Sequence, residues 1–151
     1  MPMPHAYRHA GAEWRAFLDD VRDRSGLATD NLAYTAIEAV LATFRARLTV
    51  PQALRFAAVL PAVPRAIFVT GWDATRPPDP FGTRAAQVAK VQALRPDHSL
   101  TPDSAIEDVA YALWRRVNHA ELRRVLADLG PEATRFWQVD APEAELATRF
   151  A

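Results

Sequence analysis

The chain of 151 residues contains no cysteine. This absence excludes disulfide bonds, thiolate catalysis and cysteine metal sites, and it leaves the redox compartment open. Glycine is scarce, and the five glycines form neither a phosphate-binding loop nor a dinucleotide fingerprint. The sequence also lacks a long uncharged apolar run, so no segment is expected to span a membrane.

The chain also has no excess of positive or negative charge. Lys and Arg number 18 and Asp and Glu number 18, which argues against a general electrostatic grip on nucleic acid or anionic lipid. Lys90 is the single lysine, so nearly all the basic residues are arginine. Because alanine and proline are also abundant, genomic base composition explains this preference better than phosphate recognition does. Residues 1–5 lack the apolar core of a signal peptide, so a cytoplasmic location is expected.

What is present, above all, is an internal repeat. The stretch 37–60 returns at 106–129 with an offset of 69, so that Ile37 corresponds to Ile106. A self-match at fixed offset is typical of a duplicated structural unit. Apolar residues in each copy recur every three or four positions, which predicts amphipathic helices.

The length of each copy decides the domain organisation. A unit of about 70 residues is marginal alone, because a short chain buries too little apolar surface. We therefore predict a single domain over residues 1–151, in which repeat one (about 12–72) and repeat two (about 80–138) share one core.

Helix-capping signals separate the apolar stripes. Thr49 with Gln52, and Asn118 with Glu121, match the capping box or its asparagine variant. A stripe, a capped turn and a second stripe predict an antiparallel helical hairpin in each copy. No segment shows the alternation of a strand. The predicted fold class is all-α, with two tandem pseudo-symmetric helical repeats that form one helical bundle.

Three further helix starts are predicted from caps and prolines. Asp79 followed by Pro80 predicts one start, and Thr101 followed by Pro102 predicts another. A last short helix is predicted to open between Asp140 and Glu143 and to run to Phe150. Arg95 to His98 are predicted to form a loop.

A metal site at the N-terminus is one functional hypothesis. His5, His9 and Glu13 are spaced to share one face of a helix, as metal ligands can. No second helix offers a matching pair, so a solvated terminus is the favoured interpretation.

A second hypothesis is acid–base chemistry by Asp19, Asp20 and Asp23. These carboxylates alternate with Arg22 and Arg24 on the face of an amphipathic helix that is expected to be exposed to solvent. A solvated, mutually neutralising face is therefore predicted.

The hydroxyl and imidazole side chains do not form a nucleophilic site. No G-x-S-x-G motif occurs, and the serines lie beside turns or caps. The two histidines outside the N-terminus lie near helix starts, where capping or exposure is expected. These residues are Ser25, Ser99, Ser104, His98 and His119.

Four arginines recur at matching positions of the two copies. A symmetric basic face would suit phosphates or an acidic partner. Alternatively, the arginine stems cover helix seams while their heads pair with Glu38, Glu107 or Asp128. The zero net charge favours the structural reading and disfavours nucleic acid. The four residues are Arg47, Arg55, Arg116 and Arg124.

Large aromatic residues also invite two interpretations. Trp72, Phe81, Trp114 and Trp137 are expected to fill the seam between the copies, because aromatic side chains bury the most area. The alternative is a groove between the copies that accepts a ligand or a partner helix, with Trp72, Arg76 and Phe81 at its mouth.

Several motifs together resemble a known family. They are F-L-D-D-V, A-V-L-A-T-F-R-A-R-L and A-A-V-L-P in the first half, and A-I-E-D-V-A-Y-A-L-W and A-D-L-G-P-E-A-T-R-F-W in the second. Over roughly residues 12–138 the chain resembles the bacterial proteins catalogued as domain of unknown function 2267. The resemblance implies a helical bacterial protein and carries over no catalytic residue.

The sequence thus favours a non-enzymatic interaction or regulatory module of the bacterial cytoplasm, which meets a protein partner or another copy through helix faces. No cofactor or metal is predicted. The alternative is a binder of a small apolar or anionic ligand in a groove between the two repeats. An enzyme ranks third, because it would need an unrecognised carboxylate or histidine site.

Overall fold

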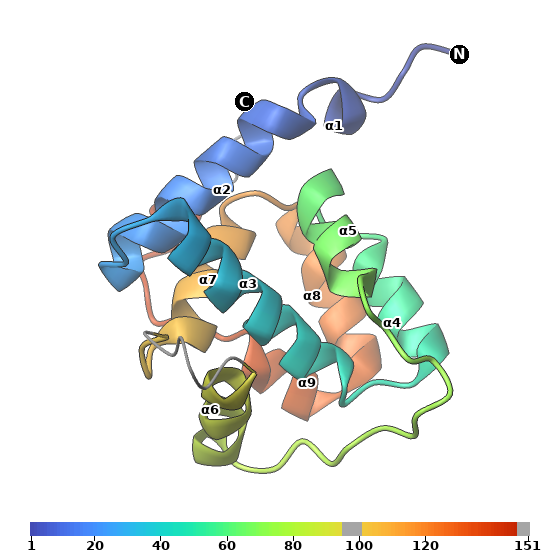
Figure 1. Cartoon of the computed structure of the whole chain (residues 1–151). Helices are drawn as coiled ribbons and strands as arrows, with labels where there is room; N and C mark the ends of the chain where they lie inside the picture. Colours follow the sequence, from blue (N-terminus) through green and yellow to red (C-terminus); the bar gives the residue numbers. More distant parts are fainter. Residues whose placement is uncertain (95–100, 148–151) are drawn as a thin grey trace.

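The computed structural model describes residues 1–94 and 101–147, which form nine α-helices and no strand (Figure 1). The all-α prediction is confirmed. His98, Ser99, the predicted loop 95–98 and Phe150 lie outside the described residues. The helices are α1 (His5–Arg8), α2 (Ala10–Ser25), α3 (Asp30–Arg45), α4 (Val50–Ala57), α5 (Ala62–Val69), α6 (Arg84–Ala93), α7 (Ala105–Trp114), α8 (His119–Leu129) and α9 (Pro131–Phe136).

None of the described helices combines the length and the apolar character needed to cross a bilayer. The N-terminal helix α1 has no buried residue, and Figure 1 shows the chain before it extending away from the other helices.

Several predicted caps are confirmed. The Thr49 hydroxyl accepts from the Gln52 N–H at 3.3 Å, and the Gln52 side chain accepts from the Thr49 N–H at 2.9 Å. The Asn118 side chain accepts from the Glu121 N–H at 3.0 Å and so caps α8. Gly26 ends α2 at a φ of 76°, a left-handed conformation that glycine adopts without strain.

Two predicted helix starts are wrong. Helix α6 begins after Thr83, whose hydroxyl accepts from the Ala86 N–H at 3.1 Å, and not at Pro80. The chain around Asp79 is instead tied to the end of α3, because its N–H donates to a backbone carbonyl there. Helix α7 begins at Ala105, directly after Ser104, so Thr101 does not act as its cap.

The predicted last helix is also wrong where the structure describes it. Residues 140–147 form turns, with the Glu145 N–H donating to Pro142 O at 3.0 Å and the Leu146 N–H donating to Glu143 O at 3.1 Å. The Tyr111 hydroxyl of α7 donates to Glu145 at 3.2 Å. This contact holds the segment against the helices.

One hydrophobic core contains residues from both predicted copies. Ile37 and Val40 of α3, together with Ile106 and Val109 of α7, are almost completely buried. The most extensive packing joins α2 to α7 and α8 to α9, followed by α3 to α6 and α7, and α4 also packs on α8. Among the described helices this packing differs from the hairpins predicted within each copy, because α4 packs chiefly on α8 and α5.

An aromatic cluster forms the centre of the core. The ring of Phe44 in α3 lies 4.7 Å from Phe56 in α4 and 4.9 Å from Phe136 in α9, measured between centroids. Trp137 stacks on Phe56 at 5.4 Å and has no exposed surface. The core prediction is therefore confirmed for Trp137. The other predicted seam aromatics are partly buried against this core.

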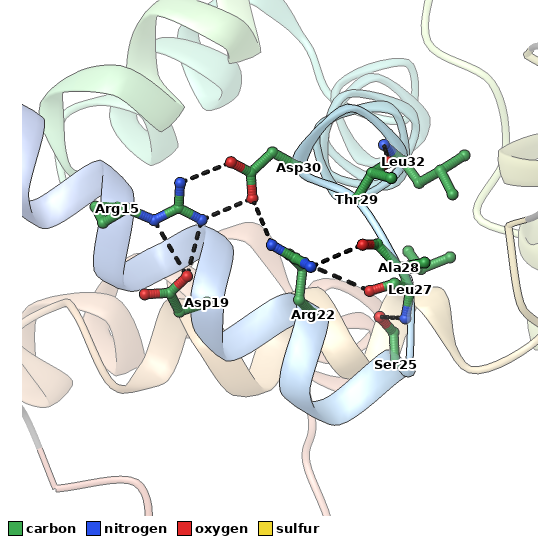
Figure 2. A network of polar contacts seen from close by, with 9 residues as sticks. All are labelled: Arg15, Asp19, Arg22, Ser25, Leu27, Ala28, Thr29, Asp30 and Leu32. Atoms are coloured by element: carbon green, nitrogen blue, oxygen red, sulfur yellow. Dashed lines mark hydrogen bonds and ion pairs between the residues drawn. The ribbon is translucent and has the colours of Figure 1, made fainter.

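A polar network closes the corner between α2 and α3 (Figure 2). Two nitrogens of Arg15 donate to the two carboxylate oxygens of Asp30, each at 2.7 Å, and Arg22 donates to Asp30 at 3.0 Å. Arg15 also pairs with Asp19 at 2.8 Å. The hydrogen bond from Arg15 lowers the pKa of Asp30 from 3.8 to about 2.

A long connector, residues 70–83, runs from α5 to α6 along the edge of the molecule (Figure 1). Its Asp79 N–H donates to Ala46 O at 2.8 Å. The Arg47 guanidinium donates to Phe81 O at 3.1 Å. The end of α3 therefore anchors the connector before α6 begins.

Candidate functional site

A pocket of about 530 Å³ lies where α7, α8, α9 and the chain after α9 meet. We call it the C-terminal pocket. Its volume is within the range of pockets that hold small molecules. The apolar part of its lining consists of Trp114, Leu126, Ala127, Val139, Ala141 and Leu146.

The turn between α8 and α9 sets the shape of the pocket. Gly130 has a φ of 111°, which favours glycine over every other residue. The Gly130 N–H donates to Leu126 O at 3.1 Å, and Pro131 begins α9 at once. A proline suits the first turn of a helix, because its missing N–H has no partner there anyway. This tight turn brings α9 against α8.

Trp114 joins α7 to the opposite wall. Its indole N–H donates to Trp137 O at 2.8 Å. His119 Nε2 lies 2.6 Å from Trp114 O, which can only accept, so this ring nitrogen donates. The two rings meet edge to face at 5.2 Å. These contacts fix the aromatic side of the pocket.

Charged groups stand at the mouth of the C-terminal pocket. The Arg123 guanidinium lies 5.8 Å from the Trp114 ring centroid. It also lies 3.6 Å from the Glu143 carboxylate, and the two side chains are 62% and 85% exposed. Ion pairs this exposed contribute little to stability. Thr134 and Gln138 complete the polar lining together with His119.

The predicted mouth residues lie elsewhere. Trp72 and Arg76 line a small hollow of about 140 Å³ beside the end of α3, and the Arg76 guanidinium lies 3.7 Å from Asp79. Phe81 lines a different hollow of about 270 Å³, to which α6 and α9 contribute. The structure therefore places Trp72 and Arg76 together and puts Phe81 in another hollow.

The four repeat arginines have different environments. Arg47 is buried, donates to Thr43 O at 2.7 Å, and has its pKa lowered by burial. Arg116 pairs with a carboxylate of α2, whereas Arg55 on α4 and Arg124 on α8 are exposed. Arg47 and Arg116 thus lie at helix seams, with the Arg47 head on backbone carbonyls and the Arg116 head on Asp20, which is not one of the predicted acidic partners. The exposed pair lies on two helices that pack together.

The predicted solvation of Asp20 is wrong. Asp20 is only 7% exposed, because α2 packs against α7 on this side. Its carboxylate accepts from Arg115 at 2.7 Å and from Arg116 at 3.3 Å. Burial raises the pKa of Asp20, and the two guanidinium groups offset part of that shift. Asp19 and Asp23 are exposed, as predicted.

A second buried carboxylate lies nearby on α7. Asp108 accepts from the Ser104 hydroxyl at 2.7 Å, and the Arg24 Nε lies 3.8 Å away. Burial raises the pKa of Asp108. The Arg24 guanidinium also stacks over the Tyr111 ring at 4.3 Å. Both buried carboxylates are bound to partners, so this cluster joins α2 to α7 and is not an open acid–base pair.

A hollow of about 270 Å³ adjoins this cluster and lies between the two predicted copies. Its lining is charged, unlike that of the C-terminal pocket. Unlike the groove predicted between the copies, this hollow has none of Trp72, Arg76 and Phe81 in its lining. It is lined by Asp20, Asp23, Arg24, Tyr111, Arg115 and Glu145.

The N-terminal histidines do not continue one helix. The rings of His5 and His9 lie 4.1 Å apart, and His9 separates α1 from α2. Within residues 1–94 and 101–147, no group of three or more His, Cys, Asp or Glu side chains is placed to hold a metal ion.

Comparison with known families assigns the chain. The family described as "Uncharacterized conserved protein (DUF2267)" matches residues 14–136, which is most of the sequence. The chain belongs to the DUF2267 family. No curated protein matches it. The matched region of this DUF2267 protein runs from α2 to the end of α9 and stops before the pocket wall at Val139 and Leu146.

The sequence alone does not predict that these side chains come together in the C-terminal pocket of this DUF2267 protein. The sequence places Trp114 in the core and His119 near a cap, whereas the structure places both in the pocket lining. The sequence predicts a helix that opens between Asp140 and Glu143 and runs to Phe150. A continuous helix there would not form the turns that place Glu143 and Leu146 in the pocket lining. Gly130–Pro131 is the one local sequence signal for the pocket. It predicts a sharp change of chain direction after α8, but it does not predict which helices the following residues contact.

Proposed function

We propose that this DUF2267 protein is a non-enzymatic helical binding module that takes a small, mainly apolar molecule in the C-terminal pocket. The observation that supports it is the pocket itself, with its volume of about 530 Å³ and its wall of Trp114, Leu126 and Val139. Such a wall gains free energy by removing apolar ligand surface from water. The proposal keeps the ligand-binding alternative and moves its place from the seam to the second copy.

The exposed apolar residues give less support to a protein interface. Apart from the N-terminal segment, the exposed large apolar side chains among the described residues are Leu54 on α4, Val69 on α5 and Leu94 after α6. These are three side chains, whereas interaction sites gather many exposed apolar residues in one patch. A regulatory role in the bacterial cytoplasm, without cofactor or metal, remains part of the proposal.

Helix positions support the proposed tandem repeat. Helices α4 and α8 begin at Val50 and His119, an offset of 69. Helices α5 and α9 begin at Ala62 and Pro131 with the same offset. A duplicated scaffold would allow one copy to keep packing roles while the other acquires a pocket, which fits the position of the pocket in the second copy.

Titration with straight-chain alcohols tests ligand binding. Backbone amide NMR spectra are recorded with hexan-1-ol, heptan-1-ol and octan-1-ol. We expect saturable shifts at Ala127 and Val139, with affinity rising about fourfold per added methylene, because each buried CH₂ contributes about 0.8 kcal/mol.

A pair of matched variants locates the site. Ala127→Trp fills the pocket from α8 and should weaken octan-1-ol binding at least tenfold. Ala120→Trp adds the same side chain at an exposed position of α8 outside the pocket and should leave binding unchanged. Absence of saturable shifts in the wild-type protein, or equal losses in both variants, would overturn the proposal.

A further inference from the structure

The geometry points to a more specific ligand class: a small organic carboxylate whose apolar body occupies the C-terminal pocket and whose carboxylate binds Arg123. This inference rests on the proposed function and adds the charge of the ligand. The two charges at the mouth differ, because Arg123 lies beside an aromatic ring on a helix and Glu143 lies in the turns after α9.

Arg123 is the charge that lies beside an aromatic ring, although its side chain is 62% exposed. It belongs to α8, a helix of 11 residues, and its guanidinium lies 5.8 Å from the Trp114 ring centroid. Stacking over an aromatic face orients a guanidinium, and its planar fork suits a carboxylate. Trp114 is itself fixed through the hydrogen bond from its indole N–H to Trp137 O at 2.8 Å.

Glu143 is the charge that can leave. It lies in the turns after α9, its side chain is 85% exposed, and its oxygen is 3.6 Å from Arg123. That distance is longer than a charge-assisted hydrogen bond, which is about 2.7–2.9 Å. Rotation of Glu143 into water would free the guanidinium at little cost. A ligand carboxylate would then replace the only carboxylate among the lining residues that the structure describes.

The positions of the apolar residues favour the same ligand. Leu126 is one turn along α8 from Arg123 and is almost completely buried, so it lies below the charged mouth. An unbranched or aromatic acid would therefore place its body against Leu126 and Trp114 while its head reaches Arg123. A cationic ligand of equal length would meet the Arg123 guanidinium and be repelled.

Octanoate, octan-1-ol and octylamine separate charge from chain length. Their dissociation constants are measured by NMR titration at pH 7.5 with wild type, Arg123→Gln and Arg124→Gln. Arg124 is an exposed neighbour on α8 that does not line the pocket, so it is the matched control. We expect octanoate to bind wild type about tenfold more tightly than octan-1-ol, and octylamine to bind most weakly.

The variants give the decisive comparison. Arg123→Gln should remove the preference for octanoate over octan-1-ol, whereas Arg124→Gln should retain the preference. Glu143→Gln should strengthen octanoate binding, because the competing carboxylate is gone. If octan-1-ol binds and octanoate binds no better, or if Arg123→Gln keeps the preference, the inference is overturned and the proposed function stands. If neither compound binds, both are overturned.

Discussion

At the scale of single residues, Asp20 departs most from what its surroundings in the sequence suggest. It lies between exposed acidic neighbours, yet it is buried and accepts from Arg115 and Arg116. Taking a carboxylate out of water is costly, which is why its pKa is raised. The contact nevertheless holds α2 against α7, because removing either partner would leave buried charge without compensation.

The first prediction concerns this buried pair. Asp20→Asn should lower the free energy of unfolding by about 3 kcal/mol, because two guanidinium groups would then face a neutral amide. Asp23→Asn, an exposed position on the same helix, should change it by less than about 0.5 kcal/mol. Urea unfolding followed by circular dichroism measures both. Equal effects of the two variants would show that burial and pairing of Asp20 do not matter.

At the scale of the elements, the corner between α2 and α3 couples folding to pH. Asp30 opens α3, and both of its carboxylate oxygens accept from Arg15 of α2. The pKa of Asp30 falls from 3.8 to about 2 in the folded protein, chiefly through this hydrogen bond. Its stabilising contribution is therefore complete above about pH 4 and is lost as the pH falls toward 2.

The second prediction follows from this loss of stability at low pH. Asp30→Asn should be less stable than wild type at pH 6, and the difference should shrink between pH 4 and pH 2 as wild type loses the ionised carboxylate. Urea unfolding at a series of pH values measures this. Asp128→Asn, an exposed position on α8, serves as control. A difference between wild type and Asp30→Asn that stays constant down to pH 2 would contradict the assignment.

The element scale also shows what local sequence can decide. The capping box at Thr49, the Asn118 cap, the stop at Gly26 and the buried stripe of Ile37 follow from local chemistry and are confirmed. The start of α6 and the turns after α9 are not, because the connector hydrogen-bonds to α3 and Glu145 accepts from Tyr111. Contacts between distant segments override a local cap or a proline at these points.

The candidate site is less predictable than the fold for the same reason. Trp114 and His119 can be noticed as single residues, but no spacing in the sequence joins them to Val139 or Leu146. The pocket exists only because α9 turns back at Gly130 and the following chain lies across α8. Side chains that line it therefore look like ordinary core or surface residues in the sequence.

At the scale of the whole molecule, the two predicted copies contribute to one core. Phe44 and Phe56 of the first half touch Phe136 and Trp137 of the second, and Trp137 has no exposed surface. Either half alone would expose one side of this aromatic cluster to water. Domains of about 70 residues have little stability to lose.

The last prediction tests that dependence. The fragments 1–78 and 79–151, expressed separately, should lack cooperative thermal unfolding and dispersed amide NMR signals, whereas the whole chain should unfold in a single transition. Differential scanning calorimetry and NMR spectra provide the measurements. A fragment that melts cooperatively on its own would show that the copies are independent domains.

The connector between α5 and α6 has a practical consequence. Residues 74–78 are exposed, while Arg45 and Arg47 hold the carbonyl groups of Thr70 and Phe81 on either side. A protease site engineered into this span would give two pieces that remain associated through the aromatic interior. Expressed as two separate pieces divided at the same span, the protein would serve as a split reporter whose reassembly can be followed in cells.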